Sequence, residues 1–103
     1  MRIRYTPQAQ TDLREVRDYI SNVLKNPVAA KNVTGRIIRS CHKLSDQPNM
    51  GASLQGKTGR NTDYRYLICE NHIAFYEVQL DCVCIIRIPD GRTDYMWTLF
   101  SGN

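Results

Sequence analysis

Three arginines in the second half of the chain have side chains that could recognise phosphate or a carboxylate-rich helix. They are Arg65, Arg87 and Arg92. The guanidinium group presents a fixed fork of N–H donors that matches both kinds of anion. The alternative is that these are ordinary surface arginines, paired loosely with Asp63, Asp90 or Asp94, and such pairs contribute little to stability. The sequence leaves both interpretations open.

Other catalytic chemistry has weaker support. His72 is predicted at a hairpin turn beside Glu70 and could act as a general acid or base, but no serine or cysteine nucleophile is identifiable beside it. Cys69, Cys82 and Cys84 could approach His72 across hairpins, yet a Cys-x-Cys pair on one strand is rarely a zinc site. The glycines lack the strand-to-helix setting of a phosphate-binding loop. We therefore expect no metal and no cofactor.

Length and charge limit the class of protein. The 103 residues predict one domain, 1–103, with one modest core. The net charge of +4 favours acidic partners, either nucleic acid or protein. No apolar run is long enough to span a membrane and the N-terminus lacks the apolar core of a signal peptide, so we expect a cytoplasmic protein with no membrane association. The four cysteines form no disulfide framework and are expected to be reduced thiols in the core.

Two amphipathic helices are predicted before the strands. Thr6-Pro7 and Asn26-Pro27 are both start signals, because the polar side chain can accept a bond from a free amide and proline needs no donor there. The apolar stripe of the first helix is Ala9, Leu13, Val16, Ile20 and Leu24. The stripe of the second is Ala30, Val33, Ile37, Cys41 and Leu44. Asp12 and Arg36 are placed outside these stripes, facing water. The short link predicts an antiparallel hairpin.

The rest of the chain predicts a small sheet. Residues 47–63 are rich in glycine and polar residues and are expected to form a loop, and strand-like runs follow at 64–69, 73–78 and 83–88. Short links make these strands sequential and antiparallel, and residues 2–5 are expected to add an edge strand. The order β-α-α-β-β-β indicates an α+β domain, with the helical hairpin packed on one face of a small curved, mainly antiparallel sheet.

The open face of that sheet is a further place where functional side chains could gather. Side chains two residues apart share a face, so the pattern groups the following sets. These are Arg65 with Leu67, His72 with Ala74 and Tyr76, and Val83 with Ile85 and Arg87. Which of these sets meet across strands is not readable from the sequence.

Four segments together resemble toxins of the RelE/ParE superfamily from bacterial type II toxin–antitoxin (addiction, plasmid stabilisation) modules. They are "YTPQAQTDLREVRDYI", "LSDQPNMG" after the second helix, "DYRYLICENHIAFYEV" and "IIRIPDGRTDYMWTLF", and the resemblance extends over essentially the whole chain. The last is similar to the family's hydrophobic strand followed by His-Gly-Arg-Arg-Asp or a variant. The resemblance implies a compact toxin neutralised by a cognate antitoxin that wraps its sheet and helices.

One branch of the superfamily cuts messenger RNA on the ribosome. In that RelE-like alternative, the resemblance implies that Arg65 and Arg92 bind phosphate and that Tyr95 acts as the acid. Leu67 stands where a second lysine is common, and Ile73 where the next strand often has arginine. These two departures weaken the nuclease interpretation.

The other branch, the ParE-like toxins, poisons DNA gyrase without being hydrolases, and this chain resembles it more closely. A growth-inhibiting interface of this kind needs no catalytic base. The residues expected to bind the target or antitoxin are Arg65, Arg87, Arg92, Asp94, Tyr95 and Trp97. A third possibility is an inactive homologue that serves as corepressor with its antitoxin. Operator DNA is expected to be reached only through the antitoxin, because no helix-turn-helix is evident and the basic helix face is moderately charged.

Overall fold

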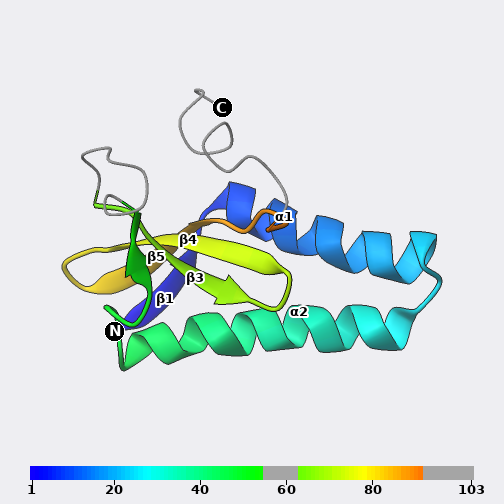
Figure 1. Cartoon of the computed structure of the whole chain (residues 1–103), viewed down its shortest axis with the longest axis horizontal. Helices are drawn as coiled ribbons and strands as arrows, with labels where there is room; N and C mark the ends of the chain where they lie inside the picture. Colours follow the sequence, from blue (N-terminus) through cyan, green and yellow to red (C-terminus); the bar gives the residue numbers. More distant parts are fainter. Residues whose placement is uncertain (55–62, 92–103) are drawn as a thin grey trace.

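The computed structural model describes residues 1–54 and 63–91. Two helices, α1 (Pro7–Asp18) and α2 (Pro27–His42), pack against one face of a five-stranded mixed sheet. Figure 1 shows that the helices run antiparallel and that their connecting end projects well past the sheet. This arrangement confirms the predicted α+β class and the helical hairpin.

The sheet follows the order β1-β5-β4-β3-β2. Its strands are β1 (Arg2–Tyr5), β2 (Ala52–Ser53), β3 (Arg65–Cys69), β4 (His72–Val78) and β5 (Cys82–Arg87). Neighbours are antiparallel except β1, which is the predicted edge strand and lies parallel to β5. β2 falls within the segment predicted as loop. That prediction was wrong for this short stretch, because Ala52 and Ser53 pair with the start of β3.

Both predicted helix starts are confirmed by their caps. The Thr6 hydroxyl accepts a bond from the Ala9 amide at 3.0 Å, and it also donates to the carbonyl of Ile86 at 2.7 Å. The Asn26 side chain accepts from the Ala29 amide at 3.0 Å. The first cap therefore ties the start of α1 to the end of β5, 80 residues along the chain.

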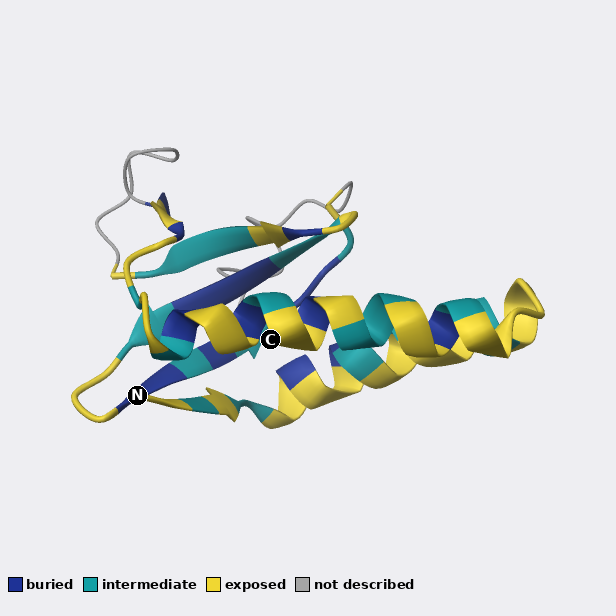
Figure 2. Cartoon of the chain, turned by 90° about the horizontal axis from the view of Figure 1, so that it is seen from below, coloured by how far each residue is buried: buried dark blue, intermediate teal, exposed yellow. Residues whose placement is uncertain are grey.

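The end of the first helix departs from the predicted stripe. α1 continues into a π-helical turn, η1 (Tyr19–Val23), and this wider turn shifts the residues after it around the helix axis. Leu24 was expected on the apolar stripe, but it is 57% exposed. The prediction was wrong at this position because it assumed uniform helical spacing. Tyr19, Val23 and Leu24 now form an exposed apolar end of the hairpin (Figure 2).

The core lies between the helices and the sheet. The side chains proposed for the open face of β4 and β5 belong instead to this helix-covered layer, because the core cluster includes Ala74, Tyr76, Val83 and Ile85. From the helical side it includes Ala9, Ile37, Cys41 and Leu44; the last of these lies in the 3-10 turn η2 (Lys43–Ser45). Cys69 and Cys82 are buried too, as expected for reduced core thiols. The candidate side chains on the predicted open face therefore face the helices.

Candidate functional site

Arg65 lies at the start of β3 and hydrogen-bonds to the loop that precedes β2. Its guanidinium donates to the carbonyl of Asn49 at 3.0 Å and to the carbonyl of Gly51 at 2.6 Å. Both bonds come from the same terminal nitrogen, and the Nε atom of Arg65 is buried without a hydrogen-bond partner among the described residues. In this structure Arg65 therefore holds residues 49–51 against the sheet.

Tyr76 holds the same loop from beneath. Its hydroxyl is fully buried, donates to the carbonyl of Pro48 at 2.9 Å and accepts from the Gly51 amide at 2.9 Å. A side chain at Gly51 would place its Cβ 2.4 Å from the carbonyl oxygen of Tyr66 and 2.6 Å from the Tyr76 hydroxyl. Glycine at this position is required by close approach of the backbone to the sheet.

Arg87 forms a two-pronged ion pair with Asp12. Its Nε donates to Asp12 Oδ2 at 2.9 Å and a terminal nitrogen donates to Oδ1 at 3.1 Å. The same Oδ2 accepts the Ile88 amide at 2.8 Å. Asp12 raises the pKa of Arg87 mainly through these hydrogen bonds. Among the described residues its ion-pair partner is Asp12 and not Asp63 or Asp90, whereas Asp94, the third predicted partner, lies outside the described residues.

Asp12 lies in a different place from the one that its sequence pattern suggested. It was assigned to the water-facing side of the first helix, but it is only 8% exposed and joins α1 to the end of β5. A signal was present, because Asp12 stands three residues after Ala9 and four before Val16, on their face of the helix. A carboxylate on a core-facing position indicates a buried partner.

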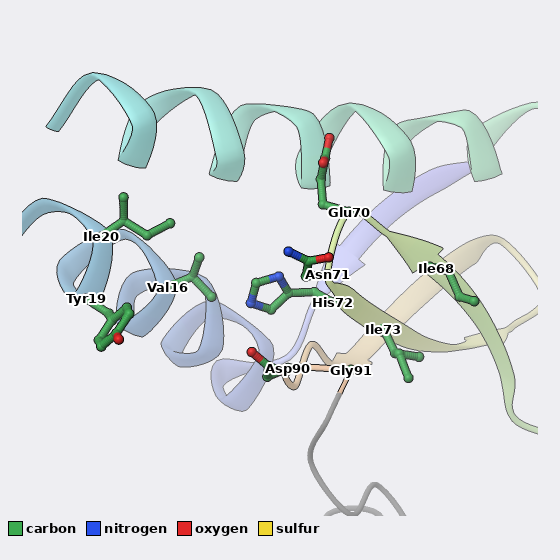
Figure 3. A pocket seen from close by; sticks show the side chains of 10 residues that line it. All are labelled: Val16, Tyr19, Ile20, Ile68, Glu70, Asn71, His72, Ile73, Asp90 and Gly91. Carbon is green, nitrogen blue, oxygen red and sulfur yellow. The ribbon is translucent and has the colours of Figure 1, made fainter. Parts of the chain in front are cut away.

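A cleft of about 720 Å³ lies between the end of the first helix and the β3–β4 turn (Figure 3). Its walls combine apolar and acidic side chains. They are Val16, Tyr19, Ile20, Ile68, Glu70, Asn71, His72, Ile73, Asp90 and Gly91. Tyr19 is 55% exposed and Ile68 is 68% exposed, so apolar surface continues from the cleft onto its rim. This combination suits the side chains of a protein partner better than a free phosphate.

His72 points into this cleft toward α1, as Figure 3 shows. It is the first residue of β4, not a turn residue as predicted, and its backbone bridges that of Asp90. Among the described residues its Nδ1 atom is buried without a hydrogen-bond partner. Burial lowers the pKa of His72, although Asp90 and Asp12 act in the opposite direction. Burial therefore favours the neutral form of the imidazole.

Hydrogen bonds link the rim of the cleft to neighbouring elements on two sides. Arg36 of α2 donates to Glu70 at 2.6 Å, with both side chains substantially exposed. On the other side, the Ile73 amide donates to the carbonyl of Pro89 at 3.1 Å, and the Gly91 amide donates to the carbonyl of Asn71 at 2.8 Å. These bonds fix the chain beside the cleft up to the residue before Arg92.

The remaining predicted site residues lie outside the described part of the structure. They are Arg92, Asp94, Tyr95 and Trp97. The two described candidates lie apart and have different partners. Arg65 bonds the loop of residues 49–51, and Arg87 pairs with Asp12.

In residues 1–54 and 63–91, no group of three or more His, Cys, Asp and Glu side chains could hold a metal ion. The same ranges contain no helix with the length and apolar character needed to span a membrane.

Comparison with known proteins agrees with this architecture. A family model described as the ParE toxin of the type II toxin–antitoxin system parDE matches residues 3–95. Among solved structures, one described as "Chromosomal ParDE TA system from P. aeruginosa" is similar at 25% identity and a TM-score of 0.73. The similarity covers 87% of this chain and 95% of that one. A search of curated protein sequences gives no match. Because the family model extends over nearly the whole sequence, the chain belongs to the ParE toxin family of the RelE/ParE superfamily.

Proposed function

We propose that this chain is the toxin of a type II toxin–antitoxin module, acts in the cytoplasm by poisoning DNA gyrase, and is neutralised by a cognate antitoxin. Its membership of the ParE family supports the toxin assignment. The similar solved structure belongs to a ParDE system, which supports an antitoxin partner for this chain too.

The observation that carries a non-catalytic mechanism is the engagement of Arg65. RNA cleavage would require a cation free to stabilise the charge that builds on phosphorus. Arg65 is the described residue among the nuclease candidates, and one terminal nitrogen of its guanidinium donates to the carbonyls of Asn49 and Gly51 while its Nε atom is buried. An interface that traps its target needs no such free group.

We assign the protein-binding surface to the cleft and the segment that follows it. The exposed side chains of Tyr19 and Ile68 supply apolar contact beside the carboxylates of Glu70 and Asp90. Arg92 and Trp97, which come next in the sequence, are the proposed anchors, because arginine and tryptophan are favoured at the centres of interfaces. The antitoxin is expected to be encoded beside the toxin gene and to have an acidic tail.

The test is a plasmid cleavage assay with purified gyrase, ATP and supercoiled plasmid, followed by protein digestion. The unmodified chain should accumulate linear DNA, and addition of the antitoxin should abolish it. Arg92→Ala should raise the concentration required by about tenfold or more, the loss of an anchor worth about 1.4 kcal/mol. The matched control is Arg14→Ala, because Arg14 is an exposed arginine whose side chain hydrogen-bonds only to Thr11 among the described residues.

Two outcomes would contradict the proposal. Intact plasmid at every toxin concentration, together with cutting of messenger RNA in a ribosome-dependent assay, would assign the chain to the RelE-like alternative. Activity in neither assay, with the chain folded, would indicate the inactive corepressor. Equal effects of Arg92→Ala and Arg14→Ala would overturn the assignment of Arg92 alone.

A further inference from the structure

Positive charge is concentrated in one segment of the chain. Residues 19–45 contain five of the 14 lysines and arginines and none of the 10 aspartates and glutamates. The other parts of the sequence hold nine cations against ten carboxylates, so they are close to neutral. The net charge of +4 therefore comes from the segment that forms the hairpin end and α2.

Most of these cations share the side of α2 that faces away from the core. Ala30, Ile37 and Cys41 are buried against the sheet. The opposite side carries Lys31, Gly35, Arg39 and His42 at spacings of about one helical turn, and Lys43 follows directly in η2; we name these five residues the α2 basic face. Its charged members are exposed.

The cations of the α2 basic face form no ion pairs with carboxylates of the described residues. Arg36, at the border of this face, pairs with Glu70. Within the described ranges, in contrast, no carboxylate lies within 4.0 Å of the charged groups of Lys31, Arg39 or Lys43. These side chains are available to an external anion.

Gly35 shapes the centre of this face. A Cβ added there would lie 3.2 Å from a terminal nitrogen of Arg39, so the guanidinium of Arg39 lies back over the helix at the position of the missing side chain. Glycine inside a helix costs about 1 kcal/mol relative to alanine. Here the missing side chain leaves space beside the helix for the guanidinium of Arg39.

We propose that the α2 basic face binds the sugar–phosphate backbone of double-stranded DNA. From Lys31 to His42, the last residue of α2, the helix rises about 17 Å, a length along which duplex DNA carries about ten phosphate charges. Protein interfaces are centred on apolar and aromatic anchors and are depleted of lysine. This face has cations at its centre and Ile38 only at its border, so a phosphate backbone fits it better than a protein partner.

This inference goes beyond the proposed function and does not depend on it. Phosphate contacts carry no sequence information, so the reading of operator bases is left to the antitoxin. The toxin would add salt-dependent affinity wherever it is held beside DNA, whether on an operator or on a DNA-bound target. The net charge of +4 is moderate, but its concentration on one face would strengthen binding to a phosphate backbone.

The test measures the binding of a short fluorescent DNA duplex of arbitrary sequence to the purified full chain across a salt series. The variant Lys31→Gln/Arg39→Gln/Lys43→Gln should reduce the slope of log affinity against log salt by about 2.7, or about 0.9 for each phosphate that the variant no longer neutralises. The matched control is Arg2→Gln/Arg14→Gln/Arg17→Gln, which removes the same charge from other surfaces. It should leave most of the slope intact.

A second variant separates binding from folding. Arg39 and Lys43 lie at the C-terminal end of α2, where cations also stabilise a helix. Lys31→Gln alone avoids that effect and should lower the slope by about 0.9 with unchanged thermal unfolding. The proposal would be overturned by equal losses in the two triple variants or by no binding of the unmodified chain at low salt. Displacement of the duplex by polyglutamate at equal charge would overturn it too, by indicating an acidic protein as the ligand.

Discussion

Two arginine–carboxylate pairs join the helices to the sheet, and they differ in burial more than in length. Arg36–Glu70 connects α2 to the β3–β4 turn at 2.6 Å, with 47% and 40% of the side chains exposed. Arg87–Asp12 connects β5 to α1 at 2.9 Å, with 26% and 10% exposed. The shorter pair lies in water, which weakens the attraction between its charges.

The buried pair has a second task that the exposed pair lacks. Asp12 also accepts the backbone amide of Ile88, so one carboxylate satisfies three donors where the chain leaves β5. Removing it would leave a guanidinium and an amide without acceptors in a shielded place. The contribution of each pair to stability should therefore depend more on how many buried donors its carboxylate accepts than on the distance between the charges.

The largest effect should come from Asp12→Ala. We expect a loss of about 3–5 kcal/mol in the free energy of unfolding, because a buried charge pair is broken with one partner left in place. Chemical denaturation measures it, with Asp18→Ala as the control, because Asp18 is an exposed aspartate on the same helix that pairs only with Arg17 among described residues. A loss of Asp12→Ala no larger than that of the control would contradict the burial argument.

A neutral contact of similar burial sharpens the comparison. Tyr76→Phe removes the hydroxyl that bonds Pro48 and Gly51 and leaves a buried carbonyl and amide without it. We expect destabilisation by about 1–3 kcal/mol. Tyr19→Phe, at a tyrosine that is 55% exposed, is the matched control and should change little. Equal unfolding midpoints for both variants would show that the loop of residues 48–51 does not depend on Tyr76.

The exposed pair should contribute least to stability among the three contacts. Arg36→Ala is expected to cost about 0–1 kcal/mol, because solvent and salt screen both groups. Repeating the unfolding measurement at high salt should remove most of the difference from the unmodified chain. A loss comparable to that of Asp12→Ala, persisting in salt, would reverse the ranking of the two pairs.

The smallest effect concerns pH. Burial lowers the pKa of His72 below its ordinary value of 6.5, so the unfolded chain takes up this proton more readily than the folded one. Stability should therefore fall as pH decreases below about 6.5. His72→Gln should flatten that part of the profile. Equal profiles for His72→Gln and the unmodified chain would contradict this role.

The sequence predicted the helices better than the contacts between elements. Thr6-Pro7 and Asn26-Pro27 are local signals, and both helices begin there. The fit of Asp12 to Arg87 depends on residues 75 positions apart, which no local pattern contains. The π-helical turn that exposes Leu24 likewise breaks the uniform spacing on which the apolar stripe was based.

The candidate site shows the same limit. Residue type identified Arg65 and Arg87 as possible anion binders, but only the tertiary arrangement shows that each is already paired within the protein. The cleft beside His72 could not be predicted, because it arises where the end of the first helix meets the β3–β4 turn. Arg92, Asp94, Tyr95 and Trp97 stay predictions from the sequence.

The most direct test of the central claim is to induce the chain in bacteria without antitoxin and follow labelled thymidine and leucine incorporation over the first minutes. A gyrase poison should stop thymidine incorporation first, while leucine incorporation continues, and antitoxin expression should restore both. An early loss of leucine incorporation with thymidine incorporation preserved would contradict the account, because it would show that translation is the primary target.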